Sequence, residues 1–259
     1  MATLVLKLTL APALVVAASL AGRMWGPRAA GLFGSMPIVA APVLLALAID
    51  QGEAFAADAA VGTLLAMVAV GGFLVTVGRV SARTRTPGTL GAAWVVFLAG
   101  AAVLSGVDVP PLLATAAGSV ALGAAAFALP RGGQAGVGVV RPAWDLPLRA
   151  AAAAALVLAV TAAADAAGPR LSGALALSPI ALSVLCGFSL ATEGRPATLV
   201  LLRGIVTGLP SVLCFFTIVA ITLEPWGIAG AFAAATAVAL SLQATVALAT
   251  VRVAASEPA

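Results

Sequence analysis

Long apolar runs separated by short polar breaks dominate the hydrophobic pattern of this chain. One helix needs roughly 20 apolar residues to cross a hydrocarbon core about 30 Å thick. Runs of this kind can be drawn at about residues 3–21, 31–49, 58–78, 89–106, 111–129, 147–166, 172–191, 197–222 and 226–250. The pattern therefore predicts an all-α fold, a polytopic helical membrane protein with about nine transmembrane helices.

The breaks between these runs carry the residues that end helices. Gly, Pro and charged residues gather in GRMWGPR, DQGE, RVSARTRTPG, EGRP and LEPWG, and such clusters are typical of turns. The least marked break separates the fourth and fifth runs, where only Asp108, Pro110 and Pro111 interrupt the apolar sequence.

Two stretches of the chain match without a gap. Residues 26–52 read GPRAAGLFGSMPIVAAPVLLALAIDQG, and residues 168–194 read GPRLSGALALSPIALSVLCGFSLATEG. At an offset of 142 positions (168 minus 26) the second stretch repeats the Gly, Pro and Arg of the first. The identities that carry the match are Gly26, Pro27, Arg28, Gly31, Pro37, Ile38 and Gly52 on Gly168, Pro169, Arg170, Gly173, Pro179, Ile180 and Gly194. The match predicts an internal duplication.

The duplication divides the chain into three parts. A first four-helix repeat occupies 1–110, a connecting helix and loop occupy 111–145, and a second four-helix repeat occupies 146–259. Five crossings lie between the starts of the two repeats, so the second is expected upside down in the membrane. Such inverted repeats are a recurring plan of secondary transporters.

The charges of the loops predict the orientation. With nine spans, one side collects Arg23, Arg28, Arg79, Arg83, Arg85, Arg131, Arg141, Arg149, Arg195 and Arg252. The other side collects only Lys7 and Arg170, with most of the acidic residues. Because cytoplasmic loops carry the excess of Lys and Arg, the N-terminus is expected outside and the C-terminus in the cytoplasm. Residues 1–22 also resemble a signal peptide, but the repeat register continues through Lys7, which favours a retained helix.

Composition narrows the function classes. Hydrophobic residues make up 63% of the chain and charged residues 8%, and mean hydropathy is +1.18, whereas soluble domains carry about a quarter charged residues. The net charge of +4 lies in loops, so no nucleic-acid partner is expected. Without His or Tyr, a Ser-His pair cannot be assembled. We expect no enzyme activity, cofactor or metal site, and no disulfide between Cys186 and Cys214.

The strongest pointers to a site are Pro37 and Pro179, each about six residues into a matching span. Proline removes an amide donor and leaves a carbonyl unpaired, which in lipid must face protein or a water-filled cavity. Prolines at corresponding places of two repeats therefore suggest a substrate site. The alternative is that both merely kink their helices.

Several polar residues complete the candidate site. Arg203 lies six residues into the eighth span and is either an anion contact or an arginine that extends to the interface. Arg149, paired with Lys7 across the repeat, either anchors a helix end, holds lipid headgroups or lines a pathway. Uncharged candidates are Ser178, Thr207, Ser211 and Gln243, although each can also bond its own helix.

The second repeat resembles the small four-span bacterial inner-membrane proteins of the GlpM type. The resemblance lies in residues 172–211, in SGALALSP, ATEGRPA, LLRG and GLPS, and is carried by Gly173, Pro179, Glu193, Arg195, Arg203 and Pro210. The first repeat keeps Gly31 and Pro37 but has Val61 and Val68 in place of Arg203 and Pro210. The resemblance implies a bacterial inner-membrane location and a link to exopolysaccharide production.

Two functions are expected from these features. The first is a secondary transporter or permease of the bacterial inner membrane, with an anionic or lipid-like substrate bound between the repeats. The second is a non-transporting accessory protein for envelope or exopolysaccharide biosynthesis. Membrane lipids and an unidentified small molecule are the expected partners, and homo-oligomerisation stays open.

Overall fold

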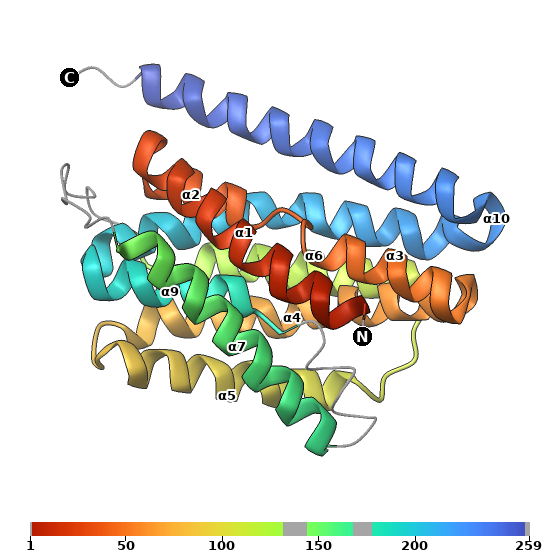
Figure 1. The fold of residues 1–259 in the computed structure, drawn as a ribbon. Coiled ribbons are helices and arrows are strands. Elements are labelled where there is room, and N and C mark those ends of the chain that lie inside the picture. The colour runs from red at the N-terminus through yellow and green to blue at the C-terminus, as the bar shows by residue number, and fades with distance from the viewer. Residues whose placement is uncertain (1, 132–143, 168–177, 257–259) are drawn as a thin grey trace.

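The computed structural model describes residues 2–131, 144–167 and 178–256, and every regular element in these ranges is an α-helix (Figure 1). The helices are α1 (Ala2–Trp25), α2 (Pro27–Gly34), α3 (Ala40–Gln51), α4 (Glu53–Val80), α5 (Thr86–Leu104), α6 (Pro111–Ala128), α7 (Asp145–Ala167), α9 (Ile180–Thr192) and α10 (Gly194–Ser256). Helix α10 reverses direction at Gly227, whose φ of 69° is reached easily only by glycine. Its first part (residues 194–226) and last part (228–256) therefore run as two antiparallel rods (Figure 1).

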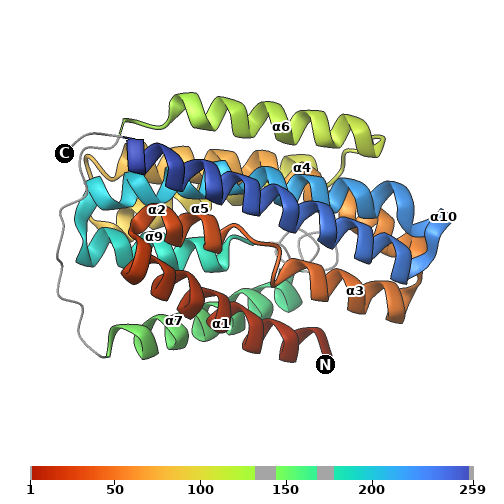
Figure 2. The same cartoon turned by 90° about the horizontal axis from the view of Figure 1, so that it is seen from above.

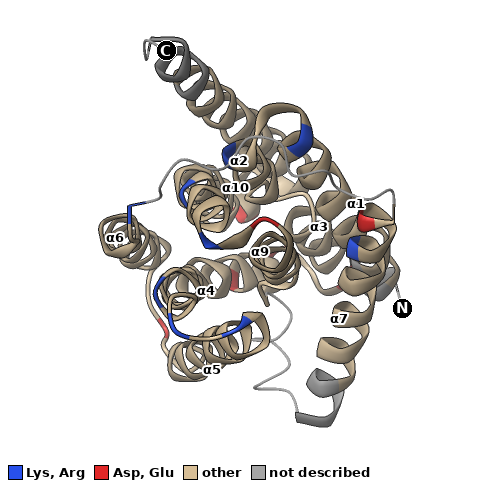
Figure 3. Ribbon diagram, turned by 90° about the vertical axis from the view of Figure 1, so that its left-hand side faces the viewer, with Lys and Arg blue, Asp and Glu red and all other residues tan. Residues whose placement is uncertain are grey.

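The helices form an elongated bundle in which most connections lie at its two ends (Figures 1 and 2). The connections α1–α2, α4–α5 and α9–α10, together with the end of α6, lie at the left of Figure 1. The connections α3–α4 and α5–α6 and the bend of α10 lie at the right. Seen from the left-hand end, the bundle presents many of its arginines (Figure 3), so we refer to it as the arginine-rich end.

Among the described residues, six helices are long and apolar enough to cross a membrane: α1, α4, α5, α6, α7 and α10. Helices α3 and α9 are apolar but shorter. Large apolar side chains such as Val103, Val120 and Phe127 are exposed on the outside of the bundle. An outer surface of exposed apolar side chains is unfavourable in water but is expected where lipid surrounds the protein. The structure therefore has the features of a helical membrane protein.

The centre of the bundle is formed by α4 and α10, which are far more buried than α5 and α6. Phe73 of α4 and Phe215 and Phe216 of α10 are buried there, with the rings of the last two in edge-to-face contact at 5.2 Å between centroids. Edge-to-face pairs are favourable because the positive ring edge meets the negative face. These aromatic residues fix the middle of the fold.

Helix α2 lies directly against the first part of α10 through two glycines. A Cβ on Gly31 would overlap the carbonyl oxygen of Leu201, and a Cβ on Gly204 would overlap the carbonyl oxygen of Arg28. Backbones approach this closely only where small residues face each other, as is common between membrane helices. The contact holds the short α2 helix in place.

The predicted spans agree with the helices at most positions. The poorly marked break near Asp108 is confirmed, since α5 ends at Leu104 and α6 begins at Pro111. The second predicted span is divided into α2 and α3, because residues 35–39 leave the helical conformation around Pro37. The start of the seventh predicted span, before residue 178, lies outside the described residues.

Candidate functional site

The break between α2 and α3 carries a buried polar cluster. Pro37 lies within this break, and α2 ends before Pro37. The carbonyl of Leu32, in the last turn of α2, therefore has no backbone partner in its own helix. The side-chain amide of Gln243 donates to this carbonyl at 2.6 Å, and the hydroxyl of Ser35 donates to it at 2.8 Å. The hydroxyl of Ser211 in turn donates to the Gln243 amide oxygen at 2.9 Å. Two parts of α10 thus stabilise the interrupted helix.

Pro179 corresponds to Pro37 at the offset of 142, and helix α9 begins directly after it. We refer to Ser178 and Pro179 as the second interruption; the chain before them lies outside the described residues. Pro179 is the N-cap residue of α9, and its carbonyl accepts a hydrogen bond of 2.7 Å from the Ser183 hydroxyl. The adjacent Ser178 hydroxyl is buried and has no hydrogen-bond partner among the described residues. An unpaired buried hydroxyl is costly. Figure 1 shows both interruptions near the middle of the bundle's length.

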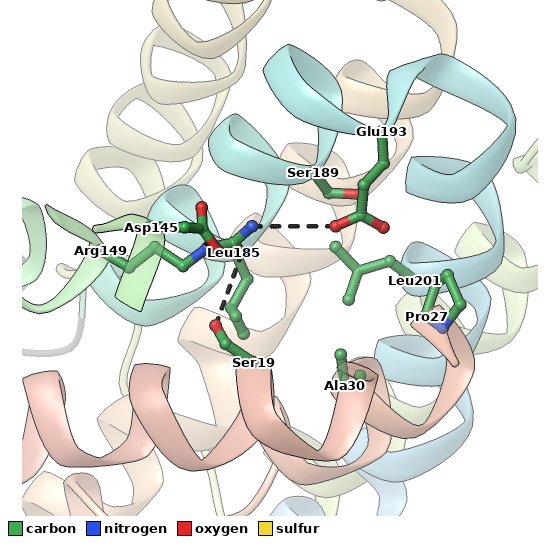
Figure 4. A pocket seen from close by; sticks show the side chains of 10 residues that line it. Ser19, Pro27, Ala30, Asp145, Arg149, Leu185, Ser189, Glu193 and Leu201 are labelled. Atoms are coloured by element: carbon green, nitrogen blue, oxygen red, sulfur yellow. Dashed lines mark hydrogen bonds and ion pairs between the residues drawn. The ribbon is translucent and has the colours of Figure 1, made fainter. Parts of the chain in front are cut away.

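Four charged side chains form an ionic cluster near the arginine-rich end, buried except for the partly exposed Arg23. Figure 4 shows the other three, Asp145, Arg149 and Glu193. Arg149 donates through Nε to both carboxylate oxygens of Asp145 at 3.0 Å, and its Nη2 lies 3.8 Å from Oε1 of Glu193. Arg23 donates to Asp145 at 2.9 Å. The guanidinium of Arg149 also lies 5.0 Å above the Phe188 ring. With two cations and two carboxylates, the cluster is balanced in charge.

The ionic cluster borders a cavity of about 10 Å³, which is room for one water molecule. Its walls come from α1, α2, α7, α9 and α10, and Figure 4 shows Arg149 extending from α7 toward Ser19 of α1 and Glu193. Arg149 is 3% exposed and Asp145 is 2% exposed. The cluster therefore ties α1 to α7 and α9 with almost no space left between them.

Arg203 lies elsewhere, beside α6. Its Nη2 donates to the carbonyl oxygens of Leu129 and Pro130, both at 3.2 Å. It lines a second cavity of about 860 Å³ together with four other arginines. Arg203 and Arg149 thus belong to two different sites.

The remaining predicted residues do not join either site. The Thr207 hydroxyl donates to Gly204 of its own helix at 2.9 Å, and Pro210 is exposed on the outside of the bundle. Ser178 and Pro179 lie together at the second interruption, whereas Pro37 lies at the first. The side chain of Lys7 and residues 168–177, including Arg170 and Gly173, lie outside the described residues.

The sequence pointed to Arg149, Ser211 and Gln243 as candidates but did not show which groups they contact in the two polar clusters. Asp145 precedes Arg149 by one helical turn, a spacing that favours an ion pair and was a usable signal. Arg23 lies 122 positions from Asp145, and Gln243 lies 211 positions from Leu32, so no local pattern could have paired them.

Within the described part of the chain, no three His, Cys, Asp or Glu side chains gather where a metal ion would bind. Cys186 and Cys214 are free thiols. Both interruptions offer polar contacts, and the ionic cluster offers charge.

Comparisons with protein-family models, with curated proteins and with solved structures find no match.

Proposed function

We propose that this protein is a secondary transporter or permease of the bacterial inner membrane, with its substrate site between two inverted repeats. The observation that carries the proposal is that a helix breaks around Pro37 and another helix begins directly after Pro179, 142 positions further along the chain. Broken helices in corresponding halves are a recurring feature of transporter substrate sites. Here the first interruption exposes a helix-terminal carbonyl to Gln243, and at the second the Ser178 hydroxyl has no partner in the described part of the chain.

The course of the helices supports the inverted repeats. Helix α1 runs from right to left in Figure 1, whereas α7, which corresponds to it at the offset of 142, runs from left to right. Helix α4 and the first part of α10 are opposed in the same way, and so are α3 and α9. Opposite directions of corresponding helices are what a twofold axis in the membrane plane requires.

The ionic cluster supports a closed pathway at the arginine-rich end. Arg23 of the first repeat contacts Asp145, which begins α7 and directly precedes the second repeat, and Arg149 contacts Glu193 within the second repeat. Opening this end by moving α1 away from α7 would break the pair of Arg23 and Asp145, so the cluster favours the closed conformation. An anionic or lipid-like substrate fits this proposal, because a basic surface raises the local concentration of anions.

The orientation gives the first prediction. The arginine-rich end is expected in the cytoplasm, with the chain ends on opposite sides. A fluorescent protein fused after Ala259 should mature and emit in the cytoplasm, whereas an epitope before Met1 should be accessible to antibody in spheroplasts without permeabilisation. Accessibility of both ends from the same side would contradict the proposed arrangement.

Alternating access gives the second prediction and needs no known substrate. In a chain carrying Cys186→Ala and Cys214→Ala, Ser178→Cys places a near-isosteric thiol at the second interruption. If the site opens to each side in turn, a membrane-impermeant maleimide should label this thiol in both right-side-out and inside-out vesicles.

Matched controls in the same background make the labelling test specific. Thr84→Cys at the arginine-rich end and Ser105→Cys at the opposite end are exposed, and each should be labelled from one side only. Labelling of Ser178→Cys from one side or neither, with full labelling after denaturation, would contradict the transporter. Co-purification with a polysaccharide synthase, without flux of organic anions in proteoliposomes, would then favour the accessory role.

A further inference from the structure

The second cavity has a different location and a different charge from the ionic cluster. It lies where α4 and α6 end and α10 begins, and its volume is about 860 Å³. Of the residues that the structure describes, five arginines and no carboxylate line it. They are Arg79, Arg83, Arg131, Arg195 and Arg203, and we call this site the basic cavity.

Three of these arginines are held by backbone carbonyls. Arg79 Nε donates to Ala128 at 3.2 Å, Arg195 Nη2 donates to Gly78 at 3.4 Å, and Arg203 Nη2 donates to the carbonyls that follow Ala128. Carbonyls at helix C-termini are partly negative and attract cations. Capping α4 and α6 is therefore one role of these side chains.

Capping uses only part of their hydrogen-bonding capacity. A guanidinium has five N–H donors, and each of these three arginines donates through one nitrogen in the bonds above. The Nε atoms of Arg195 and Arg203 are buried and have no partner among the described residues. Arg83 and Arg131 are exposed, so a ligand can reach the cavity. The arginines are thus held in place while some of their N–H groups remain available to bind a ligand.

Convergence of five like charges on one cavity is unfavourable unless an anion offsets it. Planar guanidinium groups match phosphate oxygens in bidentate geometry. Basic pockets between membrane helices on the cytoplasmic side suit phosphate-bearing lipid headgroups. We propose that the basic cavity binds a phosphate group, presented by an anionic lipid headgroup or by a soluble phosphate ester. This site is separate from the proposed transport site and does not depend on transport.

A pair of double variants tests the proposal on the full chain. Arg83→Gln with Arg131→Gln removes two exposed arginines of the basic cavity. Arg28→Gln with Arg85→Gln removes two exposed arginines of the same end that do not line it, and is the matched control with equal net charge. Retention of phosphatidylglycerol by the detergent-purified chain is measured by native mass spectrometry across a lipid titration.

Binding should weaken roughly 30-fold in the first double variant, since each arginine near an anionic surface contributes about 1 kcal/mol. The control should change by less than about threefold, and phosphatidylcholine should bind weakly to all three chains. Equal weakening in both double variants would indicate general surface attraction, and no weakening in either would show that the cavity is not the site. Both results would overturn the proposal.

Soluble competitors identify the source of the phosphate. If glycerol 3-phosphate or inorganic phosphate binds with the same dependence on Arg83 and Arg131, the ligand is a soluble phosphate. If only the lipid is retained, the ligand is a headgroup. Both results support a phosphate site in the basic cavity.

Discussion

Replacing Arg149 with glutamine should destabilise the fold by about 3 kcal/mol, at the lower end of the cost of removing one partner from a buried ion pair. Arg149 is 3% exposed, and its guanidinium contacts the carboxylates of Asp145 and Glu193. Without it, Glu193 loses this cationic partner in a site that water barely reaches. Asp145 retains Arg23, which is why we expect the lower end.

Unfolding of the purified variant in a detergent titration measures this loss. Arg28→Gln removes an exposed charge at the same end of the bundle and should change stability by no more than about 0.5 kcal/mol. Adding Glu193→Gln to Arg149→Gln should recover part of the loss, because the carboxylate that lost the Arg149 guanidinium is then removed. A loss below about 0.5 kcal/mol in Arg149→Gln would show that the ionic cluster does not hold α7 to its neighbours.

The second large effect concerns two glycines that correspond at the offset of 142. Gly204→Ala should destabilise the fold by up to about 3 kcal/mol, the upper end for overpacking. The added methyl group would meet the backbone of Arg28, which cannot turn aside as a side chain can. Helices α2 and α10 would have to separate, and the hydrogen bond from Gln243 to Leu32 would weaken with them.

The repeat supplies the control for this prediction. Gly62→Ala makes the same change at the corresponding position of α4, where a Cβ meets no atom within 4 Å. Alanine is the better helix former, so this variant should be neutral or more stable by up to about 1 kcal/mol. Opposite signs in thermal unfolding of the two variants are expected. Equal changes in stability in the two variants would mean that Gly204 is not required for the close contact between α2 and α10.

Helices and breaks were largely readable from the chain. The GRMWGPR and DQGE segments each contain a glycine with positive φ, Gly26 and Gly52, between two helices. Pro37 correctly indicated an interruption, but its extent over residues 35–39 was not predictable. How far a helix unwinds depends on whether a neighbour supplies donors to the freed carbonyls, and here Gln243 does so.

The candidate site was predicted less well than the fold. Arg203 and Arg149 both appeared as isolated basic residues near a membrane face. In the structure Arg203 lies beside the end of α6, and Arg149 lies in a charge-balanced cluster. The role of a charged side chain depends on the groups that contact it, and for Arg149 and Arg203 these groups come from several helices.

The sequence by itself determined the helices and the concentration of arginine at one end of the bundle. A helix that crosses lipid needs an apolar run of a set length, and unpaired backbone groups in lipid are unfavourable. Both requirements are met by residues adjacent in the sequence, so these features can be read from local segments. Only the tertiary structure decided which polar groups meet: Arg23 with Asp145, and Gln243 with Leu32. Those pairs depend on the close packing of helices through glycines such as Gly31 and Gly204, and packing at that precision is a property of the whole bundle.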